Sequence, residues 1–208
     1  MVEQSTVGEF LRTLSSKEPV PGGGGASSMA GALGNALGQM VANLTIGKKR
    51  YQEVEEEVKE LLVQMEAAQK QFLELADKDA QAFAPLAQCY GLSASTEEEK
   101  AHKEKVMEEC LLKASLVPLE IMKKAVKMLE ILDILAEKGS RLAVSDVGVG
   151  VQFIRTAVLG AVMNVYINTK AMKNREKAEE LNREAGELVE EGTRRADAVY
   201  EKVLVQLK

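Results

Sequence analysis

Apolar residues recur in alternating steps of four and three along two long segments of the sequence, and this heptad rhythm limits what the chain can fold into. Glu, Lys and Gln fill most of the positions between them. The pattern is typical of long helices that pack side by side. The first run comprises Val54, Val58, Leu61, Met65, Ala68, Phe72 and Leu75, and the second comprises Met107, Leu111, Ala114, Pro118, Ile121, Ala125, Met128, Leu132 and Leu135.

The two runs predict two long helices with a short loop between them. The first helix is expected over about residues 50–87 and the loop over 89–95. Thr96 and Glu99 have the spacing of a capping box at the start of the second helix, and Gly139 marks its end. Pro118 is expected to kink or interrupt this helix, because proline lacks a backbone donor and crowds the preceding turn.

Composition and spacing elsewhere predict an all-α protein. Aromatic residues make up only 4% of the chain, Trp is absent, and no segment alternates as a strand would. Further helices are expected over 4–16, from Ala26 to Ile46, from Asp146, which can cap it, to Met172, and from Asn174 to Leu207. We expect residues 1–208 to form a single domain, an elongated bundle of six helices, or seven if Pro118 divides one.

Net charge and residue types argue against several classes of function. The charge of -5 at pH 7 disfavours nucleic-acid binding, since such a domain usually has a basic face. Cys89 and Cys110 are too few for a disulfide framework or a four-cysteine zinc site, so we expect a cytoplasmic protein without a metal. The start shows no secretory signal. The only histidine, His102, lies among charged residues, which leaves acid–base chemistry to carboxylates.

The segment from Ala26 to Ile46 contains no charged residue and is long enough to cross a bilayer. It also contains amides at spacing i, i+4 and i+8, which would form one polar stripe on a helix. These amides are Asn35, Gln39 and Asn43. A second stripe of small residues, which lets another helix approach closely, comprises Ala26, Ala30, Gly34, Gly38 and Ala42. We predict a buried helix of the bundle and not a membrane span.

A carboxylate occupies a heptad position where a core side chain is expected. After Phe72 and Leu75, the next position of the apolar seam is Asp79. A carboxylate without a partner is costly to bury, so such a residue raises its pKa or finds partners, and both are common at active sites. The alternative is a structural Asp that hydrogen-bonds a neighbouring helix. Asp77 should face away from the seam.

Asn164 and Asn168 form another i, i+4 amide pair within an otherwise apolar segment. They are candidates to line the same polar pocket as the three amides from Asn35 to Asn43. The alternative is a pair of core amides that link two helices.

Gly22, Gly23, Gly24 and Gly25 form a run that follows Pro21. It matches neither the phosphate-binding P-loop nor the dinucleotide fingerprint, both of which also need a preceding strand. Glycines allow the backbone to approach a ligand closely, and a helix that begins near Ala26 offers free N–H groups to an anion or a carbonyl. The run is therefore predicted to be a ligand-facing loop.

Together these motifs resemble the formiminotetrahydrofolate cyclodeaminase family, which includes bacterial methenyltetrahydrofolate cyclohydrolases and the C-terminal half of the bifunctional formiminotransferase-cyclodeaminase. The resemblance covers nearly the whole chain, and the order of its short motifs makes it specific. They are PVPGGGGASSMAGALGNALGQMV from Pro19, IGKKR from Ile46, DKDAQAF from Asp77, SLVPL from Ser115, Ser145-Asp146, and GAVMNVYIN from Gly160.

The resemblance implies an all-helical homodimer whose catalytic aspartate is Asp79, the residue that the heptad also isolates. It implies release of ammonia from 5-formiminotetrahydrofolate to form 5,10-methenyltetrahydrofolate, with no cofactor besides the folate. Gly25 and Ala26 stand where relatives often have serine, so a hydroxyl role passes to Ser27 or Ser28. Val144 replaces an arginine of the bifunctional relative. The formiminotransferase half is absent, so substrate would arrive by diffusion or from a separate partner.

The resulting hypothesis assigns roles within one pocket. Asp79 transfers protons, and the amides, Asn164 and Asn168 included, orient the pterin ring. The glycine run and Lys48, with Lys49 or Arg50, receive the glutamate carboxylates of a folate that can be polyglutamylated. We also predict that Asp146, in the Ser145-Asp146 motif, binds the substrate.

The residues are also compatible with two other functions. A methenyltetrahydrofolate cyclohydrolase would use the same pocket with water in place of ammonia. A helical scaffold or folate carrier without catalysis would need only the heptads, although it would be expected to carry Leu or Ala at position 79.

Overall fold

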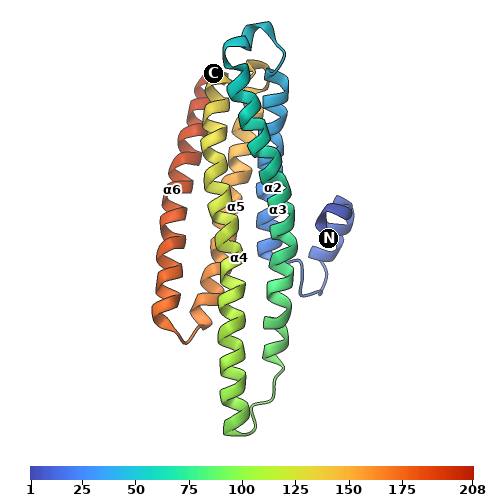
Figure 1. Ribbon diagram of the computed structural model, residues 1–208, viewed down its shortest axis with the longest axis vertical. Coiled ribbons are helices and arrows are strands. Elements are labelled where there is room, and N and C mark those ends of the chain that lie inside the picture. Colours follow the sequence, from blue (N-terminus) through green and yellow to red (C-terminus); the bar gives the residue numbers. More distant parts are fainter.

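The computed structural model describes residues 1–208 and confirms the all-α prediction (Figure 1). Six α-helices follow one another without a strand, with short 3-10 turns before α1, between α2 and α3, and between α4 and α5. They are α1 (Val7–Leu14), α2 (Gly23–Thr45), α3 (Glu55–Tyr90), α4 (Glu97–Lys138), α5 (Val144–Ala171) and α6 (Arg175–Leu207). The two longest, α3 and α4, are those that the heptads predict, and the capping box of Thr96 and Glu99 forms at the start of α4.

The bundle has two layers of paired helices. In the view of Figure 1, α3 and α4 lie in front of α2 and α5, and α6 packs along α4 and α5. The stripe of small residues brings α2 against its neighbours: a Cβ on Gly34 would lie 2.6 Å from the carbonyl oxygen of Gly150, and one on Gly38 would lie 2.9 Å from Leu132. The close approach predicted for this stripe is thus confirmed, and α2 is a helix of the core.

Pro118 does not interrupt α4, so the interruption, one of the two outcomes expected for it, does not occur. The helix runs unbroken from Glu97 to Lys138, with Pro118 buried inside it. Proline cannot donate to the carbonyl four residues earlier, which here belongs to Ala114. The side-chain amide of Asn168 on α5 donates to that oxygen instead, at 2.9 Å. A partner from another helix therefore compensates for the missing backbone bond.

The start of α5 also differs from expectation. The helix begins at Val144, after a 3-10 turn over Arg141–Ala143, and its N-cap residue is Ala143. Asp146 lies inside the first turn and caps nothing with its side chain. A carboxylate there still interacts favourably with the helix dipole, which explains why the sequence suggested a cap at this place.

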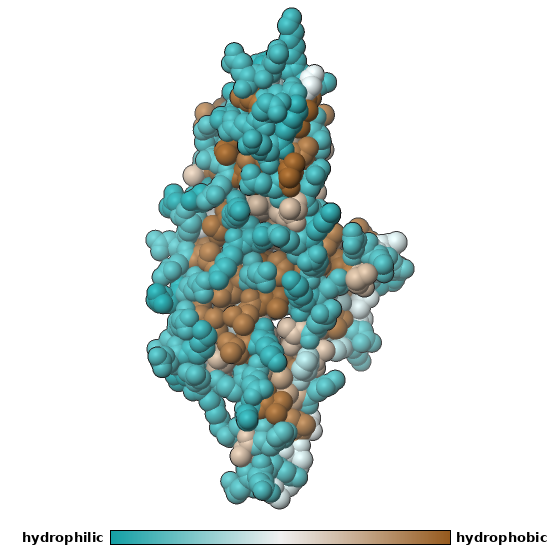
Figure 2. Space-filling model, viewed as in Figure 1, coloured by the Kyte–Doolittle hydropathy of each residue, from teal (hydrophilic) through white to brown (hydrophobic).

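Hydrophilic side chains cover most of the face shown in Figure 2, and apolar residues emerge mainly in its middle. The region Arg141–Ala171, which contains α5, is long and apolar enough to cross a membrane, and half of its most apolar window is buried in the bundle. A core helix of a bundle has the same properties, so this is weak support for a membrane. The segment that becomes α2 does not meet that criterion.

Candidate active site

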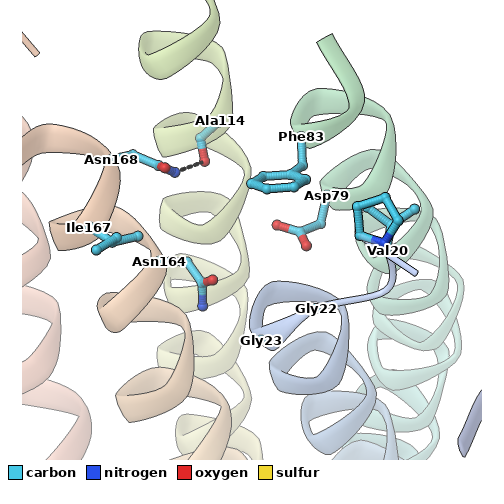
Figure 3. Close-up of a pocket in the computed structure, with 10 residues that line it drawn as sticks. Val20, Gly22, Gly23, Asp79, Phe83, Ala114, Asn164, Ile167 and Asn168 are labelled. Atoms are coloured by element: carbon cyan, nitrogen blue, oxygen red, sulfur yellow. Dashed lines mark hydrogen bonds between the residues drawn. The ribbon is translucent and has the colours of Figure 1, made fainter. Parts of the chain in front are cut away.

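A cavity of about 240 Å³ lies where the first turn of α2 meets α3, α4 and α5 (Figure 3). Asp79 is the only charged residue in its wall, and the remaining lining residues are apolar or amides. They are Pro19, Val20, Gly22, Gly23, Phe83, Ala114, Asn164, Ile167 and Asn168.

Asp79 projects from α3 toward the beginning of α2 (Figure 3). One of its oxygens, Oδ2, accepts a hydrogen bond from the backbone N–H of Gly25 at 3.0 Å. Partial burial raises the pKa of Asp79 above its ordinary value, and the Gly25 N–H offsets only part of this rise. The heptad thus correctly indicated an Asp at a helix interface. Asp77 instead accepts a hydrogen bond from the N–H of Val2 at 2.9 Å and does not line the cavity.

The glycine run is helical, which corrects the prediction of a loop. Gly22 is the N-cap residue of α2, and Gly23, Gly24 and Gly25 form its first turn. A Cβ on Gly24 would lie 2.1 Å from Oδ1 of Asp79, and one on Gly23 would lie 3.2 Å from the Asn164 amide nitrogen. Gly24, and less strictly Gly23, is therefore required by the side chain that approaches it, whereas a Cβ on Gly22 would meet nothing within 4 Å.

The first turn of α2 leaves one free backbone donor in the wall of the cavity, the N–H of Gly23, while the candidates Gly24 and Gly25 do not line it. The N–H of Gly25 is bound to Asp79, but those of Gly23 and Gly24 have no partner in the protein. Such free N–H groups at a helix N-terminus attract the electron-rich atoms of a ligand. A ligand in the cavity would therefore meet a backbone donor beside a carboxylate.

Asn164 and Asn168 line this cavity from α5, as predicted. The amide nitrogen of Asn164 donates to the carbonyl of Gly160 at 3.1 Å, which leaves its oxygen for a ligand. Asn168 donates to Ala114 and thus also links two helices, which was the alternative interpretation.

The amides of α2 do not share this cavity, contrary to expectation. Asn35 is buried against α3, where its nitrogen donates to the Met65 carbonyl and to the Gln69 side chain, both at 2.8 Å. Gln39 also donates to Gln69, at 3.2 Å, and Asn43 is exposed. The i, i+4 spacing correctly placed Asn35 and Gln39 on one face of a helix, but that face packs on α3.

Three further candidates also lie outside the cavity. Lys48 follows the far end of α2, which at 1.5 Å per residue is on the order of 35 Å from Gly23. Asp146 begins α5 at that same far end, because α2 and α5 run in opposite directions. Ser27 is buried and donates to the carbonyl of Gly23, one turn earlier in its own helix, at 2.7 Å.

Some lining residues escaped the sequence reasoning. Phe83 follows Asp79 by one helical turn and Ile167 adjoins Asn168, and both present apolar surface to the cavity (Figure 3). Spacing could have identified Phe83, since it lies at i+4 from Asp79 and therefore on the same face of the helix. Pro19 and Val20 complete the wall just before the glycine run.

The raised pKa of Asp79 has a consequence for stability. The folded protein binds the proton of this carboxyl more tightly than the unfolded chain does, so its contribution is present at low pH and is lost as pH rises through the folded-state pKa. Asp79→Asn stays neutral and can still accept from Gly25. We expect its melting temperature to exceed that of the unmodified protein by a margin that grows as pH rises from 4 and levels off above the folded-state pKa of Asp79. Thermal unfolding measures both melting temperatures. A melting temperature of Asp79→Asn that stays below that of the unmodified protein by the same amount at every pH would contradict this.

Comparisons with known proteins show the family to which the chain is similar. The model of the formiminotransferase-cyclodeaminase family matches residues 6–187. A methenyltetrahydrofolate cyclohydrolase of Methylorubrum extorquens is 38% identical over 98% of both chains. The formimidoyltransferase-cyclodeaminase of Mus musculus is 30% identical over 91% of this chain, which spans only 35% of that relative.

A solved structure also supports the relationship. The formiminotetrahydrofolate cyclodeaminase of Thermotoga maritima superposes with a TM-score of 0.83 at 29% identity, covering 100% of this chain and 98% of that one. The matches in sequence and in fold extend over nearly the same residues. The chain therefore belongs to the formiminotransferase-cyclodeaminase family and is an enzyme of folate metabolism.

Proposed function

We propose that this protein is a methenyltetrahydrofolate cyclohydrolase, which opens the bridge of 5,10-methenyltetrahydrofolate with water. The observation that carries the proposal is a lone carboxylate, Asp79, in a cavity otherwise lined by apolar groups and amides. The methenyl bridge is a cation, and a single partly buried carboxylate is suited to pair with it. The full-length similarity to the Methylorubrum cyclohydrolase supports this choice over the deaminase.

The chemistry requires one proton to move twice. Water adds to the bridge carbon while the carboxylate of Asp79 accepts a proton from it, and a tetrahedral intermediate forms. The bond from this carbon to N5 then breaks as the hydroxyl group of the intermediate loses its proton and becomes the formyl C=O. Asp79 returns the first proton to N5, and the second proton of the water is released to solvent. A carboxyl whose pKa is raised by burial is a better proton acceptor than an ordinary Asp and returns the proton within the same site.

The rest of the cavity would hold the ring in place. Phe83 and Ile167 offer apolar surface to a flat ring system, while the oxygen of Asn164 accepts from ring N–H groups. The free N–H group of Gly23 would donate to a ring carbonyl. Because the reacting atoms belong to one molecule and to water, positioning supplies much of the rate enhancement.

A second candidate is formiminotetrahydrofolate cyclodeaminase activity, which the sequence suggested first. Its support is the full-length superposition on the Thermotoga enzyme. In this reaction N10 attacks the formimino carbon, N10 loses a proton, and ammonia leaves with one. Asp79 would serve both transfers. A separate formiminotransferase would then be a partner that supplies the substrate.

Turnover of each folate distinguishes these functions. Absorbance of the methenyl group reports both reactions: its loss from 5,10-methenyltetrahydrofolate above the uncatalysed rate supports the cyclohydrolase, and its appearance from 5-formiminotetrahydrofolate supports the deaminase. Folate binding without either change would support a carrier and overturn both proposals. We further propose a cytoplasmic location, consistent with two buried free thiols, Cys89 and Cys110.

A further inference from the structure

The outward face of α2 carries no charge over its whole length. In a chain with 28% charged residues, a solvent-facing helix surface is expected to be charged, as it is on α6. The exposed positions of α2 instead comprise Gly23, Leu33, Ala36, Met40, Asn43 and Leu44. This composition is typical of a surface that another protein covers.

α5 extends this uncharged surface. It lies antiparallel beside α2, with Gly150 against Gly34 and Asn164 against Gly23. The one charged residue between Asp146 and Lys170 is Arg155, which pairs with Asp197 of α6 at 2.9 Å. The exposed residues of α5 between Asp146 and Lys170 are Val149, Thr156, Met163, Tyr166 and Ile167. We call the outward surfaces of the two helices the α2–α5 face.

The α2–α5 face is large enough for a stable interface. Its six largest aliphatic side chains are between 41% and 65% exposed. They present on the order of 500 Å² of apolar surface, against about 800 Å² that each partner buries in a standard protein interface. The six are Leu33, Met40, Leu44, Val149, Met163 and Ile167.

The charges that flank α2 favour a second copy of the chain as the occupant. The nearest charge before the uncharged stretch is Glu18 and the nearest after it is Lys48, each fifteen residues from Leu33. A two-fold axis beside Leu33 would place Lys48 of one copy near Lys17 and Glu18 of the other, where the two charges balance and Glu18 is available to pair with Lys48. A parallel arrangement would bring Lys48 against itself.

Lys48, Lys49 and Arg50 form an exposed basic turn in which no side chain makes an ion pair. The guanidinium group of Arg50 lies over the ring of Tyr51, with its Cζ atom 5.8 Å from the ring centroid. Within its own chain the turn is too far from Asp79 to touch the same folate. In the antiparallel arrangement, however, the partner's turn would lie beside Glu18 and the segment from Pro19 to Gly22, which borders the cavity.

We infer that a second copy packs antiparallel on the α2–α5 face and that its basic turn completes the mouth of the first copy's cavity. The partner's Lys48, Lys49 and Arg50 bind the carboxylates of the substrate's glutamate tail, a role that rests on the proposed function. Each dimer then has two sites, and each site combines Asp79 of one chain with the basic turn of the other.

Cross-linking tests the arrangement without any activity. Glu18→Cys combined with Lys48→Cys is expected to give covalent dimers with a short bis-maleimide, while Lys48→Cys alone gives none. The native Cys89 and Cys110 are buried and form the background control. Dimers from Lys48→Cys alone would show a parallel pairing, and the absence of dimers from both variants would also overturn the inference.

The mass in solution tests the face itself. We expect twice the 22.6 kDa of one chain by light scattering. Leu33→Glu with Met40→Glu should give monomers, whereas Val63→Glu, at an exposed position of α3, should leave the dimer intact. A monomeric unmodified protein that binds phospholipid vesicles would assign the face to a membrane instead.

Heterodimers with two different affinity tags test the shared site. A chain with Asp79→Asn and a chain with Lys48→Ala, Lys49→Ala and Arg50→Ala should together form one intact site, with an unchanged KM and half the kcat. A second heterodimer pairs a chain that carries all four substitutions with an unmodified chain. Its one site with an intact Asp79 then faces the substituted basic turn, so KM for polyglutamylated folate should rise at least tenfold. A control chain with Lys105→Ala, Lys127→Ala and Lys208→Ala should behave as unmodified.

The results separate the two proposals. If the four-substitution heterodimer keeps an unchanged KM, the basic turn does not act across the interface and the shared site is wrong. If the unmodified protein converts neither folate, the proposed function is wrong, while cross-linking and mass still decide whether the antiparallel dimer exists.

Discussion

Replacing Asp79 by Asn is expected to lower kcat by about 10²–10⁴-fold, the usual contribution of a positioned acid–base group. The amide keeps the shape of the carboxyl and can still accept the Gly25 N–H, so the cavity should retain its form. It can neither take a proton from water nor pair with a cationic bridge. Steady-state turnover and equilibrium binding of a folate measure the two effects, and binding is expected to weaken much less than turnover.

Asp77→Asn is the matched control for this change. Asp77 lies two residues away on α3 and accepts from Val2 without lining the cavity. Its substitution should leave kcat within about twofold, in line with a surface position remote from the reacting atoms. Turnover by Asp79→Asn near that of Asp77→Asn would reject Asp79 as the proton-transfer residue.

Gly24→Ala should have an effect of similar size without removing any functional group. The new Cβ would lie 2.1 Å from Oδ1 and 2.4 Å from Cγ of Asp79, so the carboxyl must move. Displacement of a catalytic group by about 1 Å can cost on the order of 10² in rate. Overpacking of this kind also costs about 1–3 kcal/mol of stability. Turnover at a temperature where the variant remains folded isolates the catalytic effect.

Gly91→Ala provides the comparison, since a Cβ there meets only the carbonyl of Gln88 at 3.5 Å, at the end of α3. It should leave turnover unchanged. Gly24→Ala with normal kcat would mean that the contact with Asp79 is not needed for catalysis.

The helices and Asp79 were predictable because both depend on periodicity within one segment. Apolar residues at heptad spacing define the buried seam of α3, and Asp79 interrupts it. Asn164 and Asn168 were found in the same way, since i, i+4 spacing places them on one face of α5. Fold class and part of the site follow from such local patterns.

The errors arose where the outcome depends on a neighbouring helix. Spacing places Asn35 and Gln39 on one face of α2 but does not reveal that Gln69 of α3 lies opposite them. Pro118 stays inside α4 because Asn168, 50 residues later, binds the carbonyl that the proline leaves free. Gly23 begins α2 where a loop was expected, and Asn164 and Asp79 occupy the space that side chains at Gly23 and Gly24 would need. None of these partners can be identified from sequence separation alone.

The single charge in the cavity also bears on how the product leaves. In the proposed hydrolysis, the substrate enters as a cation attracted to Asp79, and the reaction converts its bridge into a neutral formyl group. The electrostatic attraction therefore ends with the chemical step, while the cost of keeping the carboxylate away from water remains. Water then competes favourably for Asp79, so the cavity favours release of the opened ring and readmission of another cation.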